Sequence, residues 1–227
     1  MRRPKLILIL LSAGLIVIVS VAGWWLTRPA TYNGKTVRAW AMLVAAPDPN
    51  VRAQAHAELK RIGPEAVPVL TDMLQEQDPA FRSGAWRTAQ HLPRSLRYMV
   101  LRNVAWTNAV EVRVAAARSL AILGPEARTA IPALNQALHD KEVRVQLDAA
   151  AALGRIGRQS VPVLMQALEE NDASIRHAAA YALGEVGPDA QPAVPLLTKA
   201  LEDNDPQVRS SAAYSLSVIG PRRLPPR

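Results

Sequence analysis

One pattern recurs six times between Asp48 and Gly220, and this repetition restricts the chain to a repeat architecture. The copies begin at residues 48, 78, 109, 142, 172 and 205. A mostly leucine column follows at steps of 30, 31, 33, 30 and 33 residues, through Leu59, Ala89, Leu120, Leu153, Leu183 and Leu216. A second column has the same steps and runs through Gly63, Pro93, Gly124, Gly157, Gly187 and Gly220. Self-similarity at such a period indicates a solenoid of stacked supersecondary units.

Each copy predicts two helices joined by a short turn. The first helix begins at an N-capping aspartate in four copies: Asp48, Asp78, Asp172 and Asp205. Apolar residues then recur at helical spacing, and we expect the glycine to end the helix in a left-handed conformation. The second helix opens at a proline in four copies: Pro68, Pro132, Pro162 and Pro195. No segment shows the alternation of a strand.

Two copies depart from this pattern. The second copy has Pro93 in the glycine column and no proline opening a second helix, and the fourth copy has Gln146 in a column of arginines. Ahead of the first copy, Thr36 is a candidate N-cap for a short helix over residues 37–46. We expect this helix to cover the open apolar face of the first repeat.

The motif D-P-x-V-R-x-x-A-x-x-x-L-x-x-I-G-P-E-A-V-P-x-L, seen across residues 48–220, resembles the HEAT repeats, specifically the bacterial phycobilisome (PBS) lyase HEAT-like repeats. This resemblance implies an all-α fold of about six helix pairs. The pairs would wind as a right-handed α-α superhelix, with the second helices on its concave face. Relatives in this group include phycobilin lyases and deoxyhypusine hydroxylase, so an enzyme or enzyme accessory is the alternative function.

The N-terminal region predicts export from the cytoplasm. Residues 6–26 are apolar and uncharged, and they follow Arg2, Arg3 and Lys5. Twenty-one helical residues span about 30 Å, the thickness of a bilayer core. We therefore expect a cytoplasmic N-terminus (1–5), a transmembrane helix or signal anchor (6–26) and a linker with the capping helix (27–47). Cleavage as a signal peptide after Ser20-Val21-Ala22 is the other interpretation.

Charge is unevenly distributed along the repeats. Residues 81–118 hold seven basic side chains and one acidic one, whereas residues 119–205 hold seven basic and twelve acidic ones. In the second copy one helical stripe combines bases with aromatic rings, and its members are Arg94, Arg97, Tyr98, Arg102 and Trp106. Arginine and aromatic residues are typical of interfaces, so this stripe is the predicted partner-binding site. A solvated basic face with inward-packed rings is the alternative.

Several kinds of chemistry have no support in the sequence. The chain has no cysteine, and its four histidines form neither an H-E-x-x-H motif nor a His-Glu pair. Gly34-Lys35-Thr36 has Pro29 where a phosphate-binding loop needs glycine, so we interpret it as a turn and helix cap. We expect no metal, no cofactor and no catalysis. The arginine column (Arg52, Arg82, Arg113, Arg176 and Arg209) is interpreted as structural, each side chain reaching the preceding aspartate or nearby carbonyls.

These observations predict a membrane-anchored, non-catalytic scaffold for protein–protein interaction on the outer side of the cytoplasmic membrane. Its partner is expected to be a protein with an acidic surface, or another anionic surface such as lipid headgroups, because export disfavours nucleic acid. A cleaved, secreted form is the alternative location. The C-terminal tail, residues 221–227, is rich in proline and arginine and is expected to be disordered.

Overall fold

The computed structural model describes residues 29–77 and 108–220. They fall into two units, one ending at Thr36 and one beginning at Val37. The predicted membrane segment (6–26), the second repeat from residue 78 to 107 and the predicted disordered tail (221–227) lie outside the described residues. Within the described ranges, no helix has both the length and the hydrophobicity needed to cross a bilayer.

A small β-hairpin forms the described part of the first unit. Strands β1 (Thr31–Tyr32) and β2 (Lys35–Thr36) pair antiparallel, with Tyr32 opposite Lys35. Asn33 and Gly34 join them with φ of 49° and 76°. An Asn-Gly pair suits such a turn because both central residues must adopt positive φ. The expectation of no strand was therefore wrong here, since two-residue strands are too short to show alternation, whereas the predicted turn at Gly34 is confirmed.

The first helices of the repeats form where the sequence predicts them. They are α3 (Pro49–Ile62), α7 (Ala109–Leu123), α9 (Val143–Ile156), α11 (Ala173–Val186) and α13 (Pro206–Ile219). The carboxylates of Asp48, Asp172 and Asp205 accept backbone N–H groups of the first turn, which confirms these N-caps. Asn108 caps α7 in the same way, a role that the sequence analysis missed.

The glycines end these helices by a different backbone conformation from the one expected. Their φ is positive, between 58° and 87°, but ψ lies between −128° and −145° at four of them and is 170° at Gly220. This is the extended positive-φ region rather than the left-handed helical one, and it is nearly exclusive to glycine. The expectation of a left-handed cap was therefore wrong in ψ, although the requirement for glycine was right.

A turn of 3₁₀-helix leads from each described first helix, except the last, to a short second helix. The 3₁₀ segments are η1 (Gly63–Ala66), η2 (Gly124–Ala130), η3 (Arg158–Ser160) and η4 (Gly187–Ala193). The second helices are α4 (Val67–Leu74), α8 (Ile131–Ala137), α10 (Val161–Ala167) and α12 (Val194–Ala200). Each has its predicted proline in the second position, where the missing N–H has no helical acceptor to lose.

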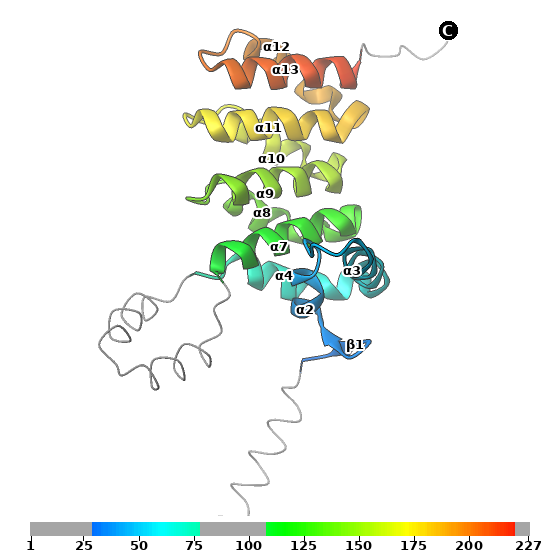
Figure 1. The fold of residues 1–227 in the computed structure, drawn as a ribbon. Coiled ribbons are helices and arrows are strands. Elements are labelled where there is room, and N and C mark those ends of the chain that lie inside the picture. Colours follow the sequence, from blue (N-terminus) through cyan, green and yellow to red (C-terminus); the bar gives the residue numbers. More distant parts are fainter. Residues whose placement is uncertain (1–28, 78–107, 221–227) are drawn as a thin grey trace, which may run out of the picture. The chain divides into compact units, whose positions relative to one another are not determined.

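Helices α7, α9, α11 and α13 lie side by side in one layer, and α8, α10 and α12 lie behind them (Figure 1). The predicted leucine column lies at the centre: Leu59, Leu120, Leu153 and Leu183 are fully buried, whereas Leu216 of α13 is partly exposed. Gly154 and Gly184 let adjacent first helices approach closely. A Cβ at Gly184 would lie 2.5 Å from Oγ of Ser215.

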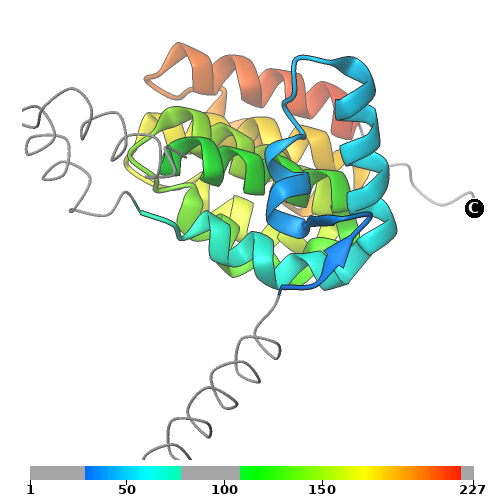
Figure 2. The same cartoon turned by 60° about the horizontal axis from the view of Figure 1, so that its bottom comes forward.

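The first repeat packs directly against the third. Helix α4 contacts α7 and α8, and the short helix α2 (Val37–Met42) contacts α3, α4 and α7. Figures 1 and 2 show α2 and α3 at the end of the layer beside α7, with α13 at the other end. The short helix predicted over residues 37–46 forms but ends at Met42, and its Trp40 is completely buried. These contacts place repeat one directly against repeat three.

Candidate functional site

The predicted partner-binding stripe cannot be placed. Its residues lie outside the part of the chain that the structure describes, and they are Arg94, Arg97, Tyr98, Arg102 and Trp106. Their role in binding an acidic or anionic partner therefore stays a prediction. The described residues present a different candidate, a groove along the loops that connect successive repeats.

A ladder of polar contacts built from the arginine column runs along these loops, and of its members Arg113 and Gln146 line the groove. Arg113 on α7 pairs with Asp140, its Nε lying 2.7 Å from Oδ2, and its Nη1 donates to the carbonyl of Glu76 at 2.9 Å. Arg176 on α11 repeats this arrangement with both oxygens of Asp203, at 2.8 and 2.9 Å. The structural interpretation of the column is confirmed for these arginines. The aspartate, however, is 27 residues further on rather than the preceding one, so each pair links a repeat to the loop before the next first helix.

The fourth repeat keeps the ladder intact with a neutral residue. Gln146, in the arginine column, donates from Nε2 to the carbonyl of Asp140 at 2.7 Å. Its Oε1 accepts the hydroxyl of Ser174 on α11 at 2.9 Å. An amide supplies both a donor and an acceptor, so it bridges two repeats without a buried charge. The departure noted in the sequence is therefore a functional replacement within the ladder.

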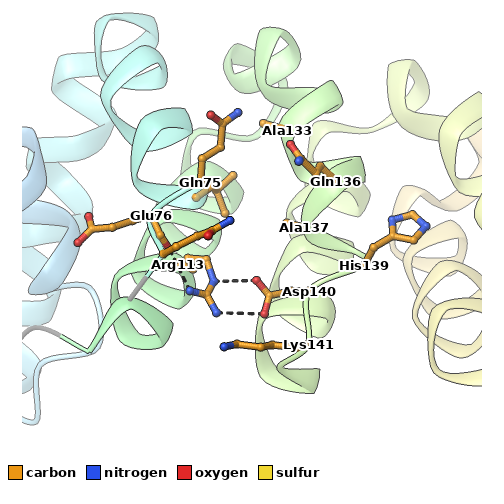
Figure 3. A pocket seen from close by; sticks show the side chains of 11 residues that line it. Gln75, Glu76, Arg113, Ala133, Gln136, Ala137, His139, Asp140 and Lys141 are labelled. Atoms are coloured by element: carbon orange, nitrogen blue, oxygen red, sulfur yellow. Dashed lines mark hydrogen bonds and ion pairs between the residues drawn. The ribbon is translucent and has the colours of Figure 1, made fainter. Parts of the chain in front are cut away.

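A cleft of about 640 Å³ opens above the Arg113–Asp140 pair (Figure 3). Its walls are the C-terminal ends of α4 and α8 together with the loop from His139 to Lys141. In Figure 3, Arg113 and Asp140 face each other, while His139 points away from them toward the next repeat. Arg113 is held at the floor by Asp140 and by the carbonyl of Glu76, although its buried Nε makes an ion-pair contact without a well-aligned hydrogen bond.

A second cleft, of about 730 Å³, adjoins the first and shares His139, Asp140 and Lys141 with it. Its far wall is the loop from Glu169 to Asp172 that joins α10 to α11. Together the two clefts form one groove that crosses three connections between repeats, and we call it the rim groove. Such a long, open shape accommodates an extended chain better than a compact small molecule.

His139 stands at the junction of the two clefts. Its Nε2 lies 2.8 Å from Oε2 of Glu170, and its Nδ1 lies 3.0 Å from the carbonyl of Asn135. Partial desolvation is the largest single influence and opposes protonation, but the contacts with Asn135 and Glu170 outweigh it and raise the pKa of His139. The imidazole is therefore held charged to a higher pH than usual, and it links the α8–α9 loop to the next repeat.

The lip of the rim groove carries groups that can pair with a peptide backbone. The amides of Gln75, Gln77 and Gln136 are exposed, and each offers both a donor and an acceptor. The far end is acidic, with Glu169 and Asp172 exposed on the wall of the second cleft. Sequence reasoning gave Asp172 a capping role only, and it missed the glutamines and Glu169 because they lie outside the repeat columns. The acidic block over residues 119–205 was the one available signal.

No group of three or more acidic or histidine side chains in residues 29–77 and 108–220 is placed to hold a metal ion. The groups that line the rim groove are hydrogen-bonding and charged side chains along an open surface.

Comparison with known families agrees with this repeat architecture. A family model described as HEAT repeats matches residues 38–121, 100–184 and 131–217. The chain belongs to the HEAT-repeat family. The matched segments include the capping helix α2 as well as the described repeats. No match was found among curated proteins.

Several solved structures share the helical-repeat fold. The complex of CpcE and CpcF of phycocyanin lyase from Nostoc sp. PCC7120 has a TM-score of 0.47 and 21% identity, covering 85% of this chain and 68% of that one. Human deoxyhypusine hydroxylase in complex with glycerol has a TM-score of 0.42 and 23% identity, covering 81% and 73%. A designed armadillo repeat protein in complex with the peptide (KR)4 has a TM-score of 0.39 and 15% identity, covering 81% and 99%. Likeness at this level carries no argument about activity.

Proposed function

We propose that this HEAT-repeat protein is a non-catalytic scaffold whose rim groove holds an extended segment of a partner protein. The observation that carries the proposal is the continuity of the two clefts over a floor with internally paired charges. Because Arg113 and Gln146 are already paired within the chain, the floor is preorganised. A preorganised surface loses little conformational entropy on binding.

The lip indicates what kind of segment the groove suits. Exposed amides along the first cleft can bond to the backbone N–H and carbonyl groups of an extended chain. Glu169 and Asp172 at the second cleft favour a basic side chain at that end of the segment. The groove therefore suits a polar, extended segment with lysine or arginine toward the α10–α11 loop.

We further propose that residues 6–26 anchor the protein with its repeats outside the cytoplasm. The apolar length of this segment and the positive residues ahead of it support this topology. An alkaline phosphatase fusion after residue 227 should be active, and carbonate washing should leave the full chain in the membrane pellet. An inactive fusion would contradict the topology, and a released fragment starting near Gly23 would show cleavage instead.

Site-specific photo-crosslinking tests the rim groove in the full chain. A photoreactive residue at Gln136 or Asn171 should crosslink to the same segment of one partner, mapped by mass spectrometry. The matched control is Gln159, an exposed glutamine in η3 that precedes α10 and lies outside the lining of either cleft. Equal crosslinking of that segment from Gln159 would contradict the proposal, as would unrelated segments captured from Gln136 and Asn171.

Charge reversal provides a second measurement. Glu169→Lys should weaken binding of the crosslinked segment by about tenfold, because it replaces attraction with repulsion at one end. Glu126→Lys changes an exposed acid that lines neither cleft and serves as its control. A partner that binds both variants equally would not depend on the acidic end of the groove.

A further inference from the structure

A second surface, separate from the rim groove, is marked by exposed apolar side chains. Seven large apolar or aromatic side chains of the described residues are exposed, and five of them lie on α9, α11 and α13. We call these five the outer stripe: Val143, Leu147, Tyr181, Tyr214 and Val218. Single exposed apolar residues are ordinary, whereas several exposed ones gathered on three neighbouring helices indicate an interaction surface.

The stripe runs diagonally across the helix layer. Each helix ends at a glycine, which gives a common reference for position along the axis. Val143 and Leu147 on α9 lie 14 and 10 residues before that glycine. Tyr181 on α11 lies six residues before it, and Tyr214 and Val218 on α13 lie six and two residues before it. Adjacent helices lie about 9 Å apart, and 12 residues of offset correspond to about 18 Å along the axis. The stripe is therefore about 25 Å long, the length of a helix of roughly 17 residues.

Its centre is a flat aromatic platform. Tyr181 and Tyr214 stack with ring centroids 5.6 Å apart and an interplanar angle of 14°. The negative charge of Glu185 is the main cause that raises the pKa of Tyr181, so its phenol stays neutral. A neutral, preformed ring pair can be covered by a partner without desolvating a charge.

The equivalent position one helix earlier in the layer is buried. Val114 on α7 stands ten residues before its glycine, as Leu147 does on α9. Val114 is only 2% exposed, whereas Leu147 is 43% exposed. Helix α2, which carries the buried Trp40, contacts α7 and has no counterpart on α9 among the described helices. Helices α2, α3 and α4 all contact α7, so the outer stripe continues a surface that the chain packs against its own helices.

Charges at the edge of the stripe define the flanks of the occupant. Arg155 is 66% exposed and lies 3.7 Å from Glu185, too far for a tight ion pair. Arg144, beside Val143, is also exposed, and Glu111 pairs with it. Arg155 is therefore the guanidinium that an acidic residue beside the apolar face of a partner helix would meet.

From these observations we propose that the outer stripe docks an amphipathic helix of a protein partner, about 17 residues long, with large apolar residues on one face and acidic flanks. The occupant is a helix rather than an extended chain because the stripe matches a helix in length and continues a surface that the chain packs against its own helices. The site is distinct from the rim groove, and either surface can bind without the other.

The test uses the full chain and a synthetic 17-residue helical peptide with leucine and tryptophan on one face and glutamates beside them. Fluorescence anisotropy should show binding with a dissociation constant below about 100 µM, and a scrambled peptide should bind at least about tenfold more weakly. Leu147→Gln with Tyr181→Ser should weaken binding by at least about tenfold. The matched control, Val69→Gln with Leu201→Gln, changes two equally exposed apolar residues elsewhere and should bind like the parent.

Other outcomes separate this proposal from its alternatives. A rim-groove variant, Gln136→Ala with Lys141→Ala, should keep full affinity for the helical peptide, whatever happens to the proposed function. The proposal is overturned if the parent does not bind the peptide, if the scrambled peptide binds equally, or if the stripe variant binds like the parent. It is also overturned if sedimentation shows that the parent self-associates and the stripe variant does not, because the occupant is then a second copy.

Discussion

Truncating one buried leucine in two repeats measures how much each repeat depends on its neighbours. Leu183 and Leu216 occupy the same position of the repeat, four residues before the glycine that ends the helix. Leu183 is fully buried on α11, which lies between α9 and α13. Leu216 is partly exposed on α13, the last described helix of the layer. We expect Leu183→Ala to destabilise the protein clearly more than Leu216→Ala.

The magnitudes follow from burial. Leucine to alanine removes about three carbon groups, and transfer alone is worth about 0.8 kcal/mol for each when it is buried, or about 2.4 kcal/mol. At Leu183 the emptied space is enclosed by packed helices, so a cavity term raises the loss to about 3–5 kcal/mol. At Leu216 solvent can reach the vacated space, and we expect about 1–2 kcal/mol.

Urea denaturation followed by far-ultraviolet circular dichroism measures both losses as differences in unfolding free energy. Leu153→Ala, at the same fully buried position on α9, is the positive control and should match Leu183→Ala. Equal losses at Leu183 and Leu216 would refute the reasoning, because α13 would then be buried as deeply as an internal repeat. A change in the slope of the unfolding free energy against urea concentration would show that repeats unfold separately, as repeat arrays allow.

Four further predictions test the ladder and the helix contacts. Arg113→Ala should cost about 3 kcal/mol in urea unfolding, because it strands the largely buried Asp140, whereas Arg144→Ala, on the exposed pair with Glu111, should cause little change. The pKa of Asp203 is lowered, chiefly because Arg176 donates to it. Its contribution to the unfolding free energy is therefore complete above the unfolded pKa near 3.9 and is lost as the pH falls through the lower folded pKa. Below about pH 4, the urea midpoint of Asp203→Asn should fall less steeply with pH than that of the parent. The pKa of His139 is raised, so its contribution to the unfolding free energy is complete below about pH 6.5 and is lost as the pH rises through the folded pKa. The loss of unfolding free energy caused by His139→Gln, measured in urea, should therefore shrink at alkaline pH. Gly184→Ala should destabilise by about 1–3 kcal/mol because its Cβ would meet Ser215 and Tyr214, while Ser217→Ala, at the corresponding exposed position of α13, should be near neutral in a thermal melt.

Much of the fold could be predicted because the same local signals recur in each copy of the repeat. Each capping aspartate, helix-opening proline and helix-ending glycine acts locally, through orphan N–H groups or backbone conformation, so one chain segment suffices to recognise it. Asn108 escaped notice because one extra residue at the start of α7 shifts its cap relative to the other copies. The hairpin at Asn33-Gly34 escaped because four paired residues carry no periodic signal.

The candidate sites depended on which repeats are neighbours in space. Contacts of α4 and of Glu76 place repeat one directly against α7. This contact creates one wall of the rim groove, so the groove could not be derived from spacing alone. The stripe chosen from the sequence, from Arg94 to Trp106, lies outside the described residues and stays a prediction.

The sequence by itself determined the repeat unit, its helix boundaries and its buried leucine column, because these depend on interactions within some thirty residues. Only the tertiary structure decided the partners of the long polar side chains. Arg113 and Arg176 reach aspartates 27 residues away, and Gln146 replaces an arginine by bonding to Ser174 on the next helix. A long side chain can choose among several acceptors of similar energy, and packing between repeats determines which one lies within reach.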